Sequence, residues 1–397
     1  MAHFQDWLIL SIRWIHFIAG AAWIGASFYF NWLNHSLRPP EEARGNIGGE
    51  VWAVHGGEFF LVNKFDGAPE KLPKTLHWFK WEAYLTWISG FAMLILVYYL
   101  KPGYLVDPTV YELTQMQGVL LGLGTLVVGW VTYDLMCKSP LGKNSRLLAL
   151  IGFALVVVVT YGLCQVMGSR AAYIHVGAML GTIMAANVFF VIIPGQRAMV
   201  GAMQKGEEPD RSKGHAGAMR SLHNNYMTLP VLFVMVSNAH PSTFGHEYNW
   251  LILAALTIIG VMTRHYFNLK TKGIKQPLWL VASALGMFTI AYLVSPKPAP
   301  AVTIEGDSAQ QVSFARAEEI MALRCVPCHA EKPTHPSFPT PPKGVILTSY
   351  DAIKAHLPTI RTTVIETQYM PLGNLTQMLP EERAELGRWI EQGAKNP

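Results

Sequence analysis

The feature that most constrains this chain is a series of long apolar runs that fills residues 7–295 and then stops. A helix needs about 20 largely apolar residues to cross ~30 Å of hydrocarbon. Only 14% of the residues are charged, well below the roughly 25% that is usual in a soluble domain. The sequence therefore predicts an all-α, eight-span membrane domain. The expected spans are 7–32, 80–100, 116–136, 147–167, 171–193, 225–239, 249–267 and 278–295, and the sixth is the weakest because its apolar run is short and contains Pro230.

Positive charge is distributed unevenly among the connections between these spans. Sixteen Lys and Arg lie in the connections 33–79, 137–146, 194–224 and 268–277, whereas the alternate connections hold only Lys101 and Arg170. Loops that remain in the cytoplasm are enriched in Lys and Arg. We therefore expect both termini on the periplasmic side of a bacterial inner membrane. The net charge of +5 follows from these loops and requires no nucleic-acid partner.

The C-terminal part reads as a soluble domain with a haem-attachment motif. Residues 325–329 are Cys325-Val-Pro-Cys328-His329, and they follow a helix-like run over 314–323. In C-x-x-C-H, two thiols one turn apart bind the haem covalently and the histidine ligates the iron. The topology delivers this motif to the periplasm, where c-type haem is attached in bacteria. We thus predict a membrane domain (1–295), a semi-rigid Pro-rich linker (296–312) and a periplasmic, class I-like cytochrome c domain (313–397).

An electron-transfer haem needs a sixth iron ligand, and methionine opposite histidine raises the reduction potential. Met370 precedes the loop-like sequence Pro371-Leu-Gly-Asn, whereas Met378 lies near the start of a helix expected over 381–392. We predict that Met370 ligates the iron of haem c and that Met378 belongs to the packing of the domain.

Two histidines, His16 and His175, lie in the outer halves of the first and fifth expected spans. Ionisable residues are costly inside a membrane and are candidates for function. Small Gly and Ala residues follow each histidine and would let a flat macrocycle approach the helix. We hypothesise that the pair ligates a non-covalent haem b; the alternatives are hydrogen-bonded core histidines or a proton relay.

A faint internal similarity accompanies these histidines. Arg13-Trp-Ile-His16 opens the first span much as Arg170-Ala-Ala-Tyr-Ile-His175 opens the fifth. A possible 4+4 pseudo-repeat about an axis along the membrane normal would explain it.

The inner ends of the expected spans concentrate polar groups. Asn187, Gln196 and Arg197 supply two amides and a guanidinium, which suits a planar, anionic ligand rich in hydrogen-bonding groups. Taken singly, Arg197 and Arg220 fit the basic loops better than a binding role. The candidates for a general base are Glu82, Asp134 and His223.

Two segments are family-like: the span-one sequence Arg13-Trp-Ile-His16-Phe-Ile-Ala-Gly-Ala-Ala-Trp-Ile-Gly25 and the span-five sequence Asn187-Val-Phe-Phe-Val-Ile-Ile-Pro-Gly-Gln196-Arg197. The haem motif that follows them is generic. Over its whole length the chain resembles the bacterial membrane-bound, cytochrome c-fused urate oxidase (urate hydroxylase or dehydrogenase) family. The resemblance implies oxidation of urate to 5-hydroxyisourate in purine catabolism, with electrons passing to the fused haem c rather than directly to oxygen. It also implies a downstream acceptor such as a soluble cytochrome c or a terminal oxidase. The region around His16 is similar, more weakly, to membrane haem proteins of the protoporphyrinogen oxidase type, in which a first-span histidine holds haem b.

Other functions fit parts of the pattern. A membrane electron-transfer subunit without its own substrate and a quinol- or porphyrin-oxidising enzyme both remain open, as does a transporter that carries a cytochrome. A haem–copper terminal oxidase is disfavoured because the chain contains no adjacent pair of histidines.

Overall fold

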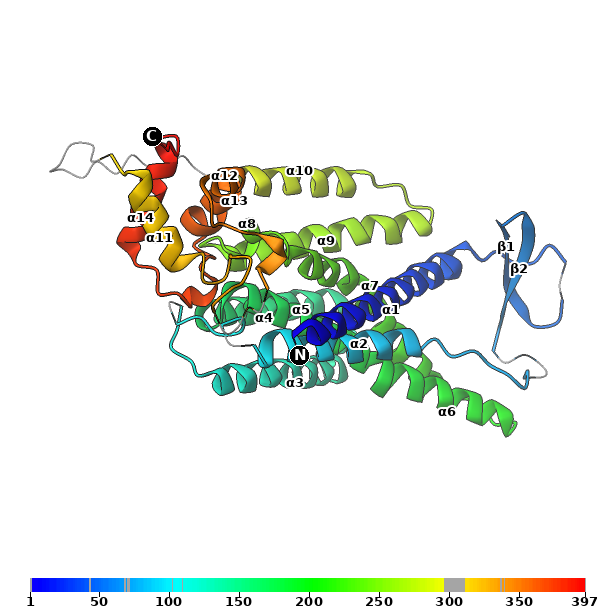
Figure 1. The fold of residues 1–397 in the computed structure, drawn as a ribbon. Helices are drawn as coiled ribbons and strands as arrows, with labels where there is room; N and C mark the ends of the chain where they lie inside the picture. The colour runs from blue at the N-terminus through cyan, green and yellow to red at the C-terminus, as the bar shows by residue number, and fades with distance from the viewer. Residues whose placement is uncertain are drawn as a thin grey trace.

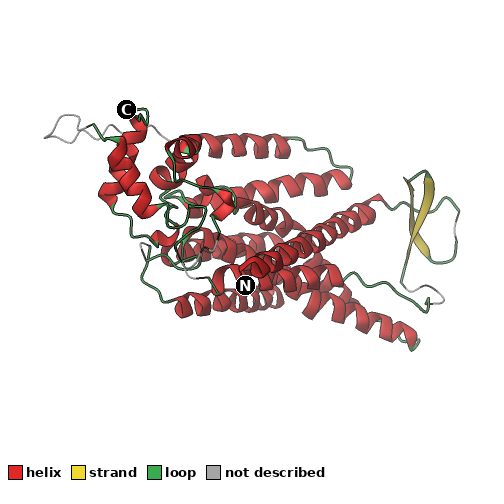
Figure 2. Cartoon of the chain, viewed as in Figure 1, coloured by secondary structure: helices red, strands yellow, loops and turns green. Residues whose placement is uncertain are grey.

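The computed structural model describes residues 2–295 and 311–396, apart from 43, 68, 70, 71, 102, 109, 336, 337 and 339. The described chain is mostly helical, and a bundle of long helices forms its larger part (Figures 1 and 2). A small helical domain formed by the C-terminal residues lies at one end of the bundle, which we call the domain end. A β-hairpin projects from the opposite end, which we call the hairpin end.

A helix lies at each of the eight positions where a span is expected. The helices of the bundle are α1 (Ala2–Ser36), α2 (Trp81–Leu94), α3 (Gln115–Lys138), α4 (Ser145–Val166), α5 (Ser169–Ala186), α6 (Ile193–Gln204), α7 (Arg211–Ser237), α8 (Pro241–Phe244), α9 (Asn249–Thr271) and α10 (Leu278–Leu293). π-Helical turns continue α2 as η1 (Ile95–Tyr99) and join α5 to α6 as η3 (Asn187–Ile192), while a 3₁₀ turn, η2 (Pro140–Lys143), precedes α4.

Six helical segments in the described part of the chain are long and apolar enough to cross a membrane. They are His3–Ser36, Trp81–Tyr99, Gln115–Lys138, Ser145–Val166, Ser169–Gln204 and Asn249–Thr271. The other two expected spans correspond to α10, which is apolar but shorter, and to α7, which is long but more polar. Large apolar side chains such as Leu150, Val158 and Phe288 are exposed on the outward faces of the bundle, a surface compatible with lipid.

Side chains at the helix starts satisfy backbone N–H groups that have no partner within the helix. Thr114 and Gln117 form a reciprocal capping box at the start of α3, and Asn144 accepts a hydrogen bond from the N–H of Leu147 at the start of α4. Asp210 caps α7 through the N–H of Ser212. These caps define where each helix begins.

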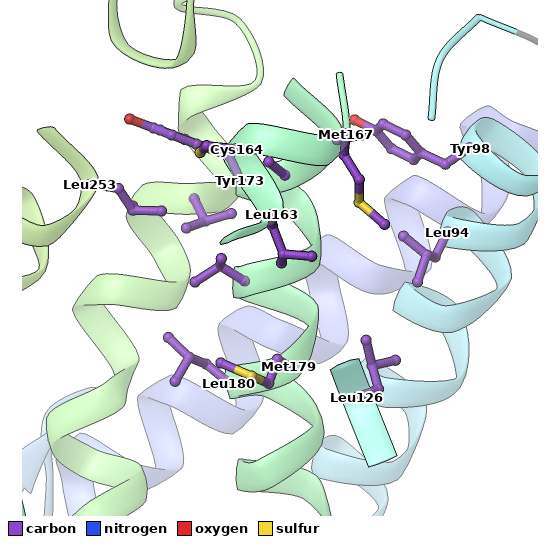
Figure 3. Close-up of a cluster of buried hydrophobic side chains, with 14 of the residues drawn as sticks. Leu94, Tyr98, Leu126, Leu163, Cys164, Met167, Tyr173, Met179, Leu180 and Leu253 are labelled. Carbon is purple, nitrogen blue, oxygen red and sulfur yellow. The ribbon is translucent and has the colours of Figure 1, made fainter. Parts of the chain in front are cut away.

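Helix α5 is the centre of the bundle and contacts α2, α3, α4 and α7. Glycines let the neighbouring backbones approach: a Cβ at Gly129 would lie 2.5 Å from Cγ of Met179, and one at Gly177 would lie 2.5 Å from Cγ1 of Val234. Close approach at small residues is the usual way in which helices pack in membranes. Figure 3 shows the apolar cluster around α5, which includes Leu126, Leu163, Cys164, Met167, Tyr173, Met179, Leu180 and Leu253.

The expectation of an all-α chain is wrong in one place, because residues 33–79 contain a two-stranded antiparallel sheet. Strands β1 (Ile47–His55) and β2 (Glu58–Phe65) pair so that His55 faces Glu58. Gly56 and Gly57 form the two-residue turn with φ of 61° and 83°, angles that glycine adopts without strain. Valine and aromatic residues on both sides favour extended backbone.

Residues 194–224, expected to form a cytoplasmic loop, are also mostly helical. The fifth span continues through η3 into α6, and α7 begins at Arg211. Only the short segment around Gly206 and Pro209 interrupts the two helices, because glycine and proline both end helices readily.

The C-terminal domain is built on helices at its two ends. It contains α11 (Phe314–Arg324), α12 (Tyr350–Ala355), α13 (Leu357–Ile360), the π-helical turn η5 (Arg361–Glu366), the 3₁₀ turns η4 (Pro342–Gly344) and η6 (Leu372–Asn374), and α14 (Pro380–Glu391). The helices expected over 314–323 and 381–392 are thus confirmed. They contact each other, and the two guanidinium nitrogens Nε and Nη2 of Arg324 each lie 2.9 Å from the carboxylate of Glu382. Most of the expected linker, 296–310, lies outside the described residues.

Candidate functional site

The haem-attachment motif follows directly on α11. Cys325 is buried and Cys328 is half-buried, and both thiols are free. Burial raises the pKa of Cys325 to about 12 and also raises that of Cys328, so both thiols are protonated at neutral pH. Free thiols one helical turn apart are the groups that covalent haem attachment requires.

His329 has the geometry of an iron ligand. Its Nδ1 lies 3.1 Å from the carbonyl oxygen of Val345, and since a carbonyl only accepts, Nδ1 carries the proton. Burial lowers the pKa of His329, although the Val345 carbonyl opposes this shift. The imidazole is therefore neutral with its lone pair on Nε2, the form that binds metals. The motif fits a covalent haem c.

The two candidate methionines have different surroundings. Met378 is 3% exposed and belongs to the core cluster that contains Cys325, whereas Met370 packs at the edge of this cluster and is partly exposed. The backbone of Met370 is fixed on both sides: its N–H donates to Thr363 at 2.8 Å, and its carbonyl accepts from Arg383 at 2.7 Å. Met370 therefore combines a fixed backbone with a side chain at the edge of the core, and its role as the iron ligand stays a prediction.

His16 packs against α2 at a glycine. Its Nδ1 donates to the carbonyl oxygen of Thr86 at 2.9 Å and lies 3.2 Å from Oγ of Ser89. A Cβ at Gly90 would lie 2.9 Å from Cε1 of the imidazole, so only glycine fits there. This tautomer leaves Nε2 with the lone pair, as a haem ligand requires.

His175 repeats the arrangement in a closed environment. It is 0% exposed, and its Nδ1 donates to the carbonyl oxygen of Ala171 at 2.8 Å. Its Nε2 lies 3.2 Å from the hydroxyl of Tyr99, and a Cβ at Gly122 would lie 2.6 Å from the same nitrogen. Both histidines thus have the tautomer that a haem b ligand requires, but Nε2 of His175 is already hydrogen-bonded to Tyr99.

A buried polar network occupies the inner part of the bundle toward the hairpin end. Arg220, only 2% exposed, donates to Asp134 at 2.7 Å and to the amide oxygen of Asn187 at 3.2 Å. The amide of Asn187 donates in turn to Asn224 at 2.8 Å and to the hydroxyl of Tyr133 at 3.2 Å. The guanidinium of Arg220 lies 4.9 Å from the Tyr133 ring centroid, a cation–π contact. The reading of Arg220 as a loop charge is therefore wrong, because its guanidinium is buried and hydrogen-bonded to Asp134 and Asn187, although its Nε has no hydrogen-bond partner among the described residues.

The three candidate bases differ in their partners. Asp134 forms ion pairs with both Arg220 and Lys138, and His223 Nδ1 lies 2.8 Å from the Tyr133 hydroxyl. Glu82, in the first turn of α2, has a buried Oε2 without a hydrogen-bond partner among the described residues. A buried carboxylate oxygen without a partner is rare and calls for a ligand, a proton or a water.

A cavity of about 410 Å³ opens at the hairpin end between α6 and the segment before α2. This volume lies in the range of small-molecule sites. Two cations and an indole contribute to its wall, which is lined by Pro73, Lys74, Thr75, Leu76, Trp78, Arg197, Val200, Gly201 and Gln204. Trp78 also packs against the apolar cluster that contains Ala83, a residue in the first turn of α2.

The structure places the three residues expected to bind the substrate in three different environments. Arg197 lines the cavity, Gln196 is exposed on α6, and Asn187 is 0% exposed within the buried network. Tyr99, Tyr133 and Lys74 were not among the sequence candidates. Their positions depend on contacts between helices, and a tyrosine or a loop lysine has no local pattern that would single it out.

Comparison with known proteins gives one match. Residues 2–295 match the family model described as urate oxidase N-terminal. Among curated proteins and among solved structures, none matches the chain. The matched region comprises the whole helical bundle and ends before the C-terminal domain. Because it covers most of the chain, this protein belongs to the urate oxidase N-terminal family.

Proposed function

We propose that the chain is a membrane urate oxidase of the dehydrogenase type, which converts urate to 5-hydroxyisourate and passes the electrons to a haem c of its own. Family membership supports a urate-related oxidation and an oxidoreductase-type enzyme. Six apolar helices and an apolar outer surface support a membrane location. The basic connections favour the cytoplasmic side for the hairpin end, and hence the periplasm for the C-terminal domain.

One observation carries the proposal: a urate oxidase family region is followed, in the same chain, by a haem-attachment motif. Cys325 and Cys328 of this motif are free thiols, and the proton of His329 lies on Nδ1, which leaves Nε2 for the iron. A urate oxidase that reacts directly with oxygen has no use for such a motif. Haem c, when bound, supplies a one-electron carrier that can pass electrons on to a soluble cytochrome c or a terminal oxidase.

The cavity at the hairpin end suits the substrate. Urate is a planar monoanion at neutral pH, and Lys74 and Arg197 supply positive charge beside the flat indole of Trp78. Gln204 adds an amide for the carbonyl and N–H groups of the purine. Arg197 and Lys74 would thus bind and orient the anion, with Trp78 covering one face.

The reaction removes two electrons and one proton from the urate anion to give neutral dehydrourate, to which water adds at C5. Overall, the urate anion and water yield 5-hydroxyisourate, two electrons and one proton. Among the candidate bases, Glu82 has a buried oxygen without a hydrogen-bond partner among the described residues, and its helix begins three residues after Trp78 of the cavity, so we assign it the uptake of that proton. Asp134 and His223 already bond to neighbouring side chains.

The decisive test is anaerobic addition of urate to the purified, haem-loaded protein while the absorption of haem c is followed. We expect reduction of the haem, with formation of 5-hydroxyisourate in a ratio of one molecule to two electrons. An intact haem that dithionite reduces and urate does not would overturn the proposal.

The same sample tests haem b. A pyridine haemochrome assay should reveal b-type haem beside c-type haem, and His16→Ala should remove the b-type signal. Detection of c-type haem alone, with a spectrum unchanged in His16→Ala, would leave His16 and His175 as structural residues.

A further inference from the structure

Two aromatic contacts join the C-terminal domain to the domain end of the bundle. The ring of Tyr369 lies 5.0 Å from that of Phe244 in an edge-to-face arrangement, and the ring of Phe338 lies 6.1 Å from that of Tyr104. Tyr369 directly precedes Met370, the predicted iron ligand. The surface that faces the bundle is therefore the surface next to the expected haem.

A guanidinium strengthens this interface. Arg170, at the start of α5, donates through Nη1 to the hydroxyl of Tyr369 at 3.2 Å and through Nε to the side chain of Asn238. It is one of only two basic residues in the connections at this end of the bundle, where the charge pattern disfavours them. A charge retained against that pattern indicates a specific role, and its visible role is to join the two domains.

The C-terminal domain also approaches the bundle closely at two glycines of the bundle. A Cβ at Gly245 would lie 2.7 Å from Cβ of Thr367, and a Cβ at Gly103 would lie 2.7 Å from Cδ1 of Leu375. A larger residue at Gly245 would push this contact apart, whereas one at Gly103 would meet only the movable end of the Leu375 side chain. Such a fit distinguishes a built docking site from a casual contact of two tethered domains.

Polar and aromatic groups continue from the interface into the core of the bundle. Tyr98 donates to the same Asn238 oxygen at 3.3 Å, and its ring centroid lies 6.3 Å from that of His175. The series His175, Tyr98, Asn238, Arg170, Tyr369 therefore runs without a break from the centre of α5 to the residue before Met370. Electron tunnelling falls steeply with distance and is faster through packed atoms than across gaps.

We propose that the contact between Arg170 and Tyr369 docks the C-terminal domain in its electron-accepting position, so that electrons enter haem c from the bundle of the same chain at the Tyr369–Met370 edge. Each electron reduces the haem iron from ferric to ferrous, and urate, the two-electron reductant, is its source. The inference rests on the proposed function for that electron source. Arg170 and Tyr369 are positioning residues, since neither touches the substrate.

The variants Tyr369→Phe and Arg170→Gln test the inference. Both remove the hydrogen bond, and Tyr369→Phe keeps the ring against Phe244. The matched control is Tyr350→Phe, which loses a phenol hydrogen bond of 3.0 Å to the carbonyl of Ala394 inside the same domain. Loss of a charged hydrogen bond should weaken docking by about tenfold or more.

Three quantities are measured on the full, haem-loaded chain. In a single turnover, urate should reduce haem c about tenfold more slowly in Arg170→Gln, with Arg170→Lys intermediate, because docking is weakened by that factor. The reduction potential of haem c should stay at the wild-type value. Hydrogen exchange of the backbone amides of residues 361–370 should become faster in Arg170→Gln and Tyr369→Phe but not in Tyr350→Phe.

Unchanged rates and unchanged hydrogen exchange in both interface variants would overturn the inference. So would a shift in the haem c potential large enough to explain the slower reduction, since Arg170 would then act on the iron site itself. If urate fails to reduce even the wild-type haem, the proposed function is lost, and hydrogen exchange alone still decides whether the contact docks the domain.

Discussion

The two ends of the helical bundle carry different kinds of side chain. At the domain end, aromatic rings meet at close range around one guanidinium whose partners, Asn238 and Tyr369, are neutral. At the hairpin end, two cations, Lys74 and Arg197, line an open cavity, and a buried ion-paired network lies within the bundle. Aromatic packing holds redox groups at fixed distance, whereas cations collect an anion from water. Under the proposed function, this contrast separates the handling of electrons from the handling of substrate.

This separation predicts distinct effects of mutation. Changes at the domain end should alter electron transfer and leave the KM for urate unchanged. Changes at the hairpin end should alter substrate affinity or stability and leave the haem c potential unchanged.

The largest expected effect is loss of the cytochrome function in Cys328→Ala. Without its second thioether the haem should be lost or loosely held, and substrate-driven reduction of an external cytochrome should cease. Haem staining of the denatured protein and acceptor assays measure both effects. The control, Cys164→Ala in the bundle core, should retain the covalent haem. Retention of full electron transfer in Cys328→Ala would contradict the assignment of the motif.

The next largest effect concerns the buried network. Arg220→Met leaves Asp134 without its buried partner, so the free energy of unfolding should fall by about 3–5 kcal/mol. The control is Lys138→Met, which removes the other partner of the same carboxylate. The side chain of Lys138 is 67% exposed, so its loss should lower the free energy of unfolding by at most about 1 kcal/mol. Thermal or denaturant unfolding in detergent compares the two. Equal losses would show that the network does not depend on burial.

A smaller effect is expected at the cavity. Arg197→Gln should raise the KM for urate by about ten- to a hundredfold, the range for loss of a charged hydrogen bond, without change in the haem c potential. Arg211→Gln is the matched control, because Arg211 forms only an exposed ion pair with Glu208. An unaltered KM in Arg197→Gln would move the substrate site away from this cavity.

The smallest effect is a pH dependence inside the C-terminal domain. Burial alone would raise the pKa of Glu382, but hydrogen bonds from Arg324 and from the backbone N–H of Leu379 hold it below the usual 4.5. A lowered folded-state pKa stabilises the fold fully above 4.5, and this stabilisation is lost as the pH falls through the folded-state value.

Glu382→Gln should therefore lower the free energy of unfolding at pH 7 by about 1 kcal/mol and flatten its decrease in acid. Melting of the protein at a series of pH values, followed through the haem absorption, provides the comparison. Parallel curves for the variant and the wild type would rule out this carboxylate as a source of acid sensitivity.

The sequence predicted the C-terminal domain best where the signals are local. The Cys325–His329 motif, its preceding helix and the final helix are all encoded in short segments, and so are the apolar runs of the bundle. The hairpin was missed even though Gly56-Gly57 between aromatic and β-branched residues is a recognisable turn signal. The basic residues of 33–79 predict only a connection between two spans and carry no information on extended structure within it.

The remaining features depend on contacts between distant residues. Arg220 looks like any loop arginine in the sequence, and only the packing of α3, η3 and α7 buries it. Asn187 is buried while Arg197 lines the cavity, and this difference likewise follows from the helix that continues beyond the fifth span. Tyr369 gains its interest from Arg170, which lies 199 residues earlier in the chain. No periodicity encodes such a pair.

The π-helical turn η3 has a geometric consequence for the helix that it interrupts. Such a turn holds one residue more than the α-helical turn that it replaces, and each residue advances a helix by about 100°. The segment from Ser169 to Gln204 therefore has two angular phases, one that aims α5 into the core and another that aims Arg197 into the cavity. Deletion of a single residue within 187–192 would remove this offset, and an unbroken α-helix would then aim Arg197 into the cavity much as before, while α5 stays in place.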